Sequence, residues 1–146
     1  MAAILSDYFA VNAQLTQFAG QWFKLEPESH TRLGAANHEL GISTVAGERV
    51  WDDQSKFELN FGPLTLERFT AFLPTGSAHK PVVSLVRYLV GLEFDFDLRL
   101  TLKASEVPGC VLTTRAKRKP LLGWTTWLKT DAFVGDDSQV VLSANA

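Results

Sequence analysis

The sequence has little of what most enzymes and metalloproteins use for their chemistry. It contains one cysteine, Cys110, so an internal disulfide and a multi-cysteine metal site are both excluded. Its three histidines form no His-x-x-x-His or Glu-x-x-His pair, and the chain has neither a glycine-rich phosphate loop nor a Gly-x-Ser-x-Gly turn. We therefore expect no catalytic residue, no cofactor and no bound metal.

A strong excess of charge of one sign is also missing, as are long apolar runs. The formal net charge is −2, which argues against nucleic acid as the main partner. No apolar stretch approaches the roughly 20 residues that a membrane-spanning helix needs, and the first residues lack the pattern of a signal peptide. We expect a globular, cytoplasmic protein that does not insert directly into a membrane.

The charge that is present is distributed unevenly. Residues 1–75 carry a net charge of −4, and residues 76–146 carry a net charge of +2. Much of this difference comes from one basic run, which contains Arg115, Lys117, Arg118 and Lys119. Such a run is usually a solvated loop. The alternative is a docking patch for an acidic partner or an anionic membrane surface.

Hydrophobic periodicity predicts short helices and alternating strands. The expected helices cover residues 3–10, 65–73 and 82–90. The expected strands cover residues 11–18, 57–61 and 94–103, with shorter ones at 44–51 and 140–142. Gly62-Pro63 is expected to end the strand before it, and a shift of the apolar phase near Thr16 predicts a bulge. The expected fold is α+β, with an antiparallel sheet and short helices.

The two halves of the chain resemble each other. Tyr8 and Tyr88 each follow a short helical pattern, a Leu-Gly pair recurs at residues 40 and 122, and an Asp-Asp pair recurs at residues 52 and 136. The offsets of 80, 82 and 84 residues are nearly constant. We interpret this pattern as a tandem duplication into two related helix–strand units, residues 1–76 and 77–146. Chance similarity between two helix–strand pairs is the alternative.

Three tryptophans lie beside turns, where a large ring is either a core anchor or part of an interface. Trp51 leads into a strand, so burial in the core is the simpler expectation for it. Trp124 and Trp127 lie in the apolar segment 121–128, close to the basic run, and there an interface is more plausible. The Asp-Asp pairs could in principle bind a cation, but turn formation is the simpler role for them.

Several segments together resemble a known family. They are GERVWDDQSKF at 47–57, GPL at 62–64, FLP at 72–74, LVR at 85–87, EVP at 106–108 and LGWTTWL at 122–128. In this order and spacing they are similar to the C-terminal portion of TssG, a baseplate subunit of the bacterial type VI secretion system. The resemblance covers nearly the whole chain. TssG is longer, and its N-terminal part has no counterpart in this sequence.

The resemblance implies a structural role without catalysis. A TssG-like chain is expected to belong to the baseplate wedge, to bind two copies of TssF, to dock TssK trimers, and to meet TssE through the wedge. It would be held near the inner membrane only through the secretion complex. The expected partner interface contains Trp51, Leu121, Leu122, Trp124, Trp127, Leu128, Arg115, Lys117, Arg118 and Lys119. The alternative is a small ligand- or carbohydrate-binding module whose exposed tryptophans line a groove.

Overall fold

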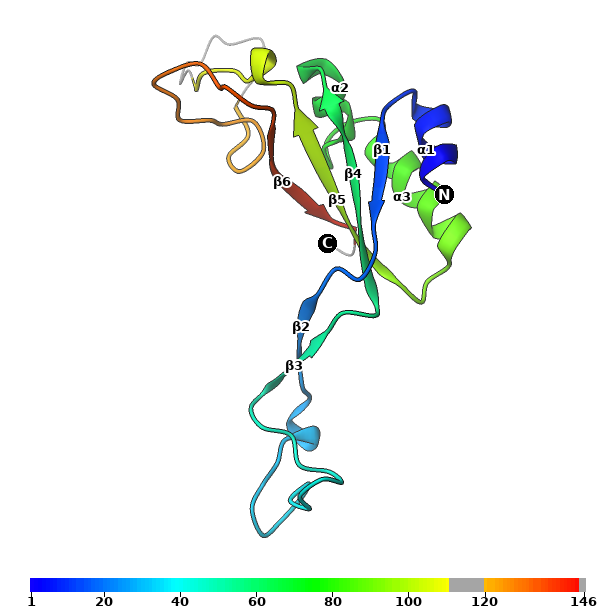
Figure 1. Cartoon of the computed structure of the whole chain (residues 1–146), viewed down its shortest axis with the longest axis vertical. Coiled ribbons are helices and arrows are strands. Elements are labelled where there is room, and N and C mark those ends of the chain that lie inside the picture. Colours follow the sequence, from blue (N-terminus) through cyan, green and yellow to red (C-terminus); the bar gives the residue numbers. More distant parts are fainter. Residues whose placement is uncertain (111–119, 145–146) are drawn as a thin grey trace.

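The computed structural model describes residues 1–110 and 120–144, and it shows a sheet with helices packed against it and a long projecting arm (Figure 1). The helices are α1 (Ala2–Phe9), α2 (Leu66–Phe72) and α3 (His79–Val90), with short 3-10 turns at Pro27–Ser29 and Ala104–Glu106. The strands are β1 (Ala13–Thr16), β2 (Gln21–Lys24), β3 (Arg49–Asp52), β4 (Lys56–Leu64), β5 (Asp95–Leu102) and β6 (Asp137–Ser143).

Four of the strands form one mixed sheet in the order β1-β4-β5-β6. The two outer pairs, β1–β4 and β5–β6, are antiparallel, whereas the central pair β4–β5 is parallel. A parallel pair needs a crossover connection, and α2 and α3 supply it between β4 and β5. The predicted α+β class is confirmed. The sheet contains the expected antiparallel strands, and it also contains this parallel pair, which the pattern of single strands did not reveal.

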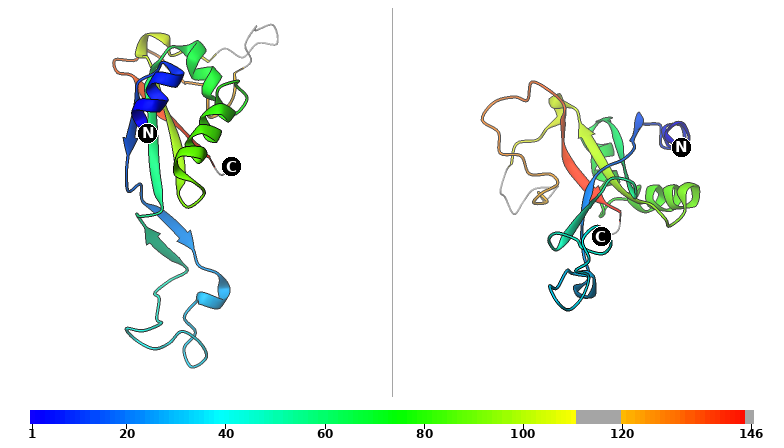
Figure 2. Two further views of the ribbon diagram at one scale, coloured as in Figure 1. Left: turned by 90° about the vertical axis from the view of Figure 1, so that its right-hand side faces the viewer. Right: turned by 60° about the horizontal axis from the view of Figure 1, so that its bottom comes forward.

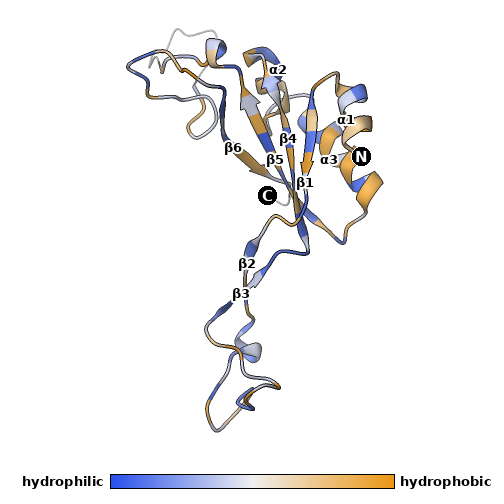
Figure 3. Ribbon diagram, in the orientation of Figure 1, coloured by the Kyte–Doolittle hydropathy of each residue, from blue (hydrophilic) through white to orange (hydrophobic). Residues whose placement is uncertain are grey.

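The core lies on one face of the sheet. Alternate residues of β4 and β5 are buried, and Figure 3 shows this alternation as blue and orange bands along the strands. The helices contribute their apolar sides to the same cluster, so that α1 and α3 lie on one side of the sheet in the right-hand view of Figure 2. The fully buried side chains are Leu5, Leu59, Phe61, Phe69, Leu73, Val82, Val86, Phe96, Leu98, Leu100 and Leu102.

The start of α2 follows the sequence signals. Thr65 is the N-cap, and its hydroxyl accepts a hydrogen bond from the Arg68 amide at 3.4 Å, as a capping threonine does. The carboxylate of Glu106 accepts a second bond from the Leu66 amide at 2.6 Å. Leu64 before the cap and Phe69 in the helix are both buried, in the positions of a hydrophobic staple.

The expectation that Gly62-Pro63 ends its strand is wrong. Strand β4 continues through this pair to Leu64, and the Gly62–Pro63 peptide bond is cis. Gly62 has φ +145°, and a Cβ atom there would lie 2.5 Å from the Thr101 carbonyl oxygen of β5. Only glycine permits this close approach of two neighbouring strands, and the β4–β5 register shifts at this point.

The bulge predicted near Thr16 falls where the chain leaves the sheet. Strand β1 ends at Thr16, and the chain leaves the sheet at Phe18, whose φ is +59°. The Ala19 amide still bonds to the Lys56 carbonyl at 2.9 Å, and the separate ribbon β2–β3 then begins. Between the Thr16–Glu58 pair and this bond the chain advances three residues while β4 advances two, so one extra residue is accommodated here, as the shift of apolar phase predicts.

The two halves share an order of elements: a helix, a strand, an excursion, and a strand antiparallel to the first. The first half has α1, β1, the arm and β4, and the second half has α3, β5, a long connection and β6. Strands β1 and β5 run in opposite directions, however, and both helices face the same core. The tandem duplication and the division into residues 1–76 and 77–146 stay predictions.

Candidate partner-binding surface

The arm, residues 17–55, leaves the sheet after β1 and returns at the start of β4. It projects away from the sheet along the long axis of the molecule (Figures 1 and 2). None of its residues is buried, so the arm has no hydrophobic core of its own. It is held by the β2–β3 ladder and by bonds such as those that join Thr31 and Val45 at 2.9 and 3.0 Å. An isolated two-stranded ribbon of this kind is only marginally stable in water.

The arm presents a pair of tryptophans. Trp22 and Trp51 are directly opposite in the ribbon, with ring centroids 5.3 Å apart and planes at 67°. The residues are 62% and 53% exposed, so the expectation that Trp51 is buried in the core is wrong. The Trp51 ring lies against Gly20, where a Cβ atom would be 1.9 Å from the ring. This contact and the edge of Trp22 fix the orientation of the exposed indole.

Other apolar side chains extend along the same arm. Sequence reasoning did not select them, because they lack the strict alternation of a half-buried strand. Exposed aromatic and apolar side chains that gather on one element are typical of protein–protein interfaces. Besides Trp22 and Trp51, the exposed apolar residues of the arm are Phe18, Phe23, Leu33, Leu40, Ile42 and Val50.

A polar turn closes the ribbon next to the sheet. The Asp52 carboxylate accepts bonds from the Gln54 amide at 2.9 Å and from the Ser55 hydroxyl. The Ser55 bond is the main reason that the pKa of Asp52 lies below its usual value, and the Gln54 amide adds to it. The Asp52–Asp53 pair therefore has the turn role expected from the sequence.

The second predicted surface, segment 121–128, lies at the end of the sheet away from the arm (Figure 1). Leu122 and Leu128 are 92% and 97% exposed. Leu121 and Trp124 are half-buried and pack against the core. The basic residues predicted beside this segment, Arg115, Lys117, Arg118 and Lys119, lie outside the described residues.

Trp127 belongs to the core rather than to the exposed surface. It is 7% exposed, and its ring centroid is 5.9 Å from that of Phe69. Its indole nitrogen donates a hydrogen bond of 2.8 Å to the carboxylate of Asp137, which is 4% exposed. A buried carboxylate needs such a donor. The predicted interface role of Trp127 is corrected to packing, because its ring faces inward.

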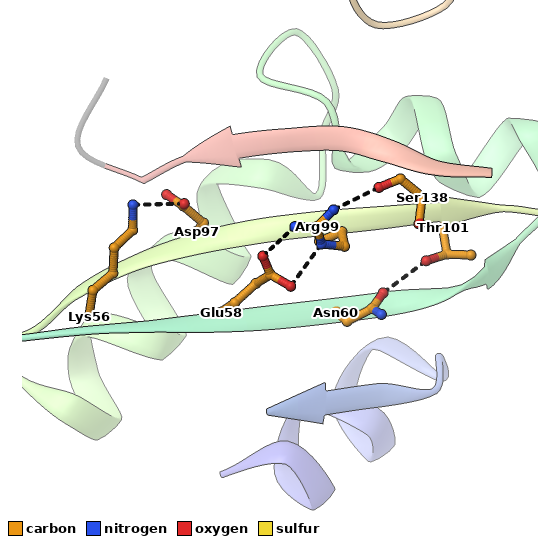
Figure 4. Close-up of polar contacts among 7 residues, drawn as sticks. All are labelled: Lys56, Glu58, Asn60, Asp97, Arg99, Thr101 and Ser138. Atoms are coloured by element: carbon orange, nitrogen blue, oxygen red, sulfur yellow. Dashed lines mark hydrogen bonds and ion pairs between the residues drawn. The ribbon is translucent and has the colours of Figure 1, made fainter. Parts of the chain in front are cut away.

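The face of the sheet opposite the helices carries a set of polar cross-strand pairs (Figure 4). Arg99 donates two bonds of 2.7 Å to the Glu58 carboxylate and a third of 3.0 Å to the Ser138 carbonyl. Lys56 forms an ion pair with Asp97 at 2.8 Å. The hydrogen bond from Arg99 is the main cause of the lowered pKa of Glu58. These pairs connect neighbouring strands, so they hold the sheet together.

A pocket of about 390 Å³ lies where the arm joins the sheet. This volume is in the range of small-molecule sites, but no tryptophan lines the pocket, so it is not the groove that the carbohydrate alternative requires. Its lining residues are Met1, Leu15, Gln17, Phe18, Gln54, Lys56, Phe57, Val90 and Phe94.

Across residues 1–110 and 120–144, no three His, Cys, Asp or Glu side chains gather closely enough to hold a metal ion. His30 and His79 each contact a backbone carbonyl at 3.1 Å, those of Leu25 and Phe72. No helix there is long and apolar enough to cross a membrane.

The helix-covered sheet and the exposed ribbon define an α+β protein with a long projecting arm that exposes apolar side chains. Residues 1–129 match the family model described as type VI secretion, TssG. The chain belongs to this family.

Two solved structures are similar in fold. One is a chain of the type VI secretion TssK-TssF-TssG baseplate subcomplex seen by cryo-electron microscopy, with a TM-score of 0.72 at 20% identity over 96% of this chain and 60% of that one. The other is a chain of the type VI secretion baseplate complex, with a TM-score of 0.62 at 18% identity over 97% of this chain and 40% of that one. This chain thus spans 60% and 40% of the lengths of those chains, less than two thirds in each case. No curated protein matches.

Proposed function

We propose that this chain is a structural component of a type VI secretion baseplate and that it joins TssF and TssK without catalysing a reaction. The observation that carries the proposal is the family match over residues 1–129. The similarity of fold to a chain of a TssK-TssF-TssG subcomplex supports it. The chain would lie in the cytoplasm, and the rest of the secretion complex would hold it near the inner membrane.

The mechanism of such a component is mechanical. The sheet acts as a rigid frame, because a shared core lies beneath its four strands and two ion pairs join β4 to β5. The arm carries Trp22 and Trp51 away from this frame to a partner. Buried aromatic anchors supply most of the binding energy in many interfaces, so the Trp22–Trp51 pair is the main attachment point in this proposal.

A second attachment surface lies at the other end of the sheet. It uses the exposed Leu122 and Leu128, with Leu121 and Trp124 at their base. Two separate surfaces allow one chain to bridge two partners. In this proposal the partners are two copies of TssF, TssK trimers, and TssE through the wedge. The basic run of residues 115–119 would be an additional contact.

The proposal is tested by co-purification. The chain is co-expressed with TssF and TssK of the same organism, and native mass spectrometry gives the stoichiometry of what elutes. We expect a complex that weakens by about thirtyfold or more when Trp22→Ala and Trp51→Ala are combined, since even one central aromatic contributes about 2 kcal/mol or more. Tyr88→Ala, at an exposed aromatic residue of α3, is the matched control. Failure of the wild-type chain to bind either protein would refute the proposal.

The exposed tryptophan pair also favours one alternative, a carbohydrate-binding module. Sugars stack on exposed indole rings, so binding would change the tryptophan fluorescence. A glycan panel titrated against the wild-type chain and the Trp22→Ala/Trp51→Ala variant separates the two functions. Under the baseplate proposal, no glycan changes the fluorescence of the wild-type chain.

A further inference from the structure

The two faces of the β2–β3 ribbon differ in chemistry. In the register of the ribbon, Trp22 lies opposite Trp51 and Lys24 lies opposite Arg49. Alternate residues of a strand point to the same side, so these four side chains share one face, here called the Trp–cation face. Phe23 and Val50 lie on the reverse face.

Lys24 and Arg49 are like charges placed directly across the ribbon. Side chains at such positions are about 5 Å apart at Cβ, and like charges there are destabilising. Among the described residues, neither Lys24 nor Arg49 belongs to an ion pair such as Lys56–Asp97 or Arg99–Glu58. Glu48 precedes Arg49, and the alternation of the strand directs it to the reverse face. An anion supplied from outside the chain would remove this repulsion.

The rest of the arm has the opposite charge. Its basic residues are Lys24, Arg32 and Arg49, and its acidic residues are Glu26, Glu28, Glu39, Glu48, Asp52 and Asp53. Two of the three basic residues therefore meet on the face that also exposes both tryptophans. An acidic partner would be attracted to this face and repelled by the acidic tip of the arm. This difference in charge would direct the partner toward the ribbon.

We propose that the Trp–cation face binds a segment of another protein that carries carboxylates beside an apolar side chain. The apolar side chain packs against the Trp22–Trp51 pair, and the carboxylates accept hydrogen bonds from Lys24 and Arg49. Arginine binds a carboxylate through two parallel bonds, and tryptophan and arginine are the side chains most enriched in interface hot spots. This inference rests on the proposed function, because it describes the partner surface that the arm attaches to.

The test measures the affinity of the whole chain for purified TssF and purified TssK of the same organism at two salt concentrations. We expect Lys24→Glu combined with Arg49→Glu to weaken binding by about thirtyfold or more, because truncating one partner of a desolvated charge pair typically costs 2 kcal/mol or more. Lys80→Glu, at an exposed lysine on α3, reverses a single charge away from the ribbon. It should leave the affinity unchanged.

Two further variants separate contact from folding. The exchange Lys24→Arg with Arg49→Lys keeps both positive charges and should retain binding within about threefold. The neutral pair Lys24→Gln with Arg49→Gln should bind weakly, and its affinity should depend less on salt than that of the wild-type chain, since fewer charges meet at the interface. Circular dichroism in the tryptophan region checks that the ribbon is intact in each variant.

The possible failures are distinguishable. If the wild-type chain binds and the charge-reversed variant binds equally well, the Trp–cation face is refuted while the baseplate proposal stands. If the wild-type chain binds neither TssF nor TssK, the baseplate proposal and the Trp–cation face are both refuted. If phosphatidylglycerol vesicles bind the wild-type chain but not the charge-reversed variant, the face recognises a lipid surface, and the protein-partner proposal is overturned.

Discussion

Replacing Trp127 with phenylalanine is predicted to destabilise the fold strongly although the residue lies in a segment with exposed leucines on both sides. The indole nitrogen donates a 2.8 Å hydrogen bond to the buried Asp137 carboxylate. Phenylalanine keeps an aromatic ring beside Phe69 but removes this donor. The carboxylate is then left buried with one partner fewer, a loss that exceeds the value of an average hydrogen bond.

The magnitude follows from two contributions. A hydrogen bond to a charged group contributes about 1.5 to 3 kcal/mol, and the smaller ring leaves space that costs about 1 kcal/mol more. We expect a loss of about 3 kcal/mol in the free energy of unfolding, out of a total of roughly 5 to 15 kcal/mol for a domain. With a urea m value of about 2 kcal/mol per M, the unfolding midpoint should fall by roughly 1.5 M.

A urea titration monitored by circular dichroism measures this shift, and two control variants show whether it is specific to Trp127. Trp124→Phe makes the same substitution at a half-buried ring and should cost about 1 kcal/mol. Leu128→Ala, at a fully exposed residue, should change the free energy of unfolding by less than about 0.5 kcal/mol. If Trp127→Phe were no more costly than Leu128→Ala, the reasoning from burial and the Asp137 bond would be refuted.

Three further outcomes are expected. Gly20→Ala should displace the Trp51 ring, because the new Cβ would lie 1.9 Å from it, and near-ultraviolet circular dichroism should lose the signal of the tryptophan pair. Gly62→Ala should lower the free energy of unfolding by about 2 kcal/mol or more in urea titration, since φ is +145° and the neighbouring strand is too close. Arg99 lowers the pKa of Glu58, so this pair stabilises the fold above the ordinary pKa of a glutamate and the effect is lost as the pH falls through the lowered pKa. Glu58→Gln should therefore cost up to about 1 kcal/mol at neutral pH, as a partly exposed pair does, and nothing in strong acid. An effect that persisted in acid would contradict this.

Most elements of the sheet domain could be predicted from periodicity. The alternation from Phe94 to Leu102 matches β5, and the capping signals at Thr65 match the start of α2. What could not be predicted is pairing. Whether β4 and β5 run parallel depends on the path of the crossover between them, which no single strand encodes. Gly62-Pro63 normally interrupts a strand, and here it continues one because the approach to β5 requires a residue without a side chain.

The candidate site was predicted less well than the fold. Trp51 was selected, although burial was expected for it and the structure exposes it. Its neighbour Trp22 was missed, because β2 and β3 are short and lie about 25 residues apart in the sequence, so that only the fold pairs them. Trp127 was placed at the surface because its neighbours are turn-like. Its hydrogen-bond partner Asp137 lies on β6 and leaves no signature in the sequence around Trp127.

The way the arm is attached has a consequence for how such proteins diverge. Residues 17–55 begin and end on β1 and β4, which are adjacent antiparallel strands, so cutting the arm out and joining its ends with a short turn would leave an ordinary hairpin. Because nothing in the arm is buried, its sequence can drift, lengthen or be exchanged for that of a relative without disturbing the folding of the domain. Assembly specificity and fold stability can thus be inherited, and engineered, as separate traits.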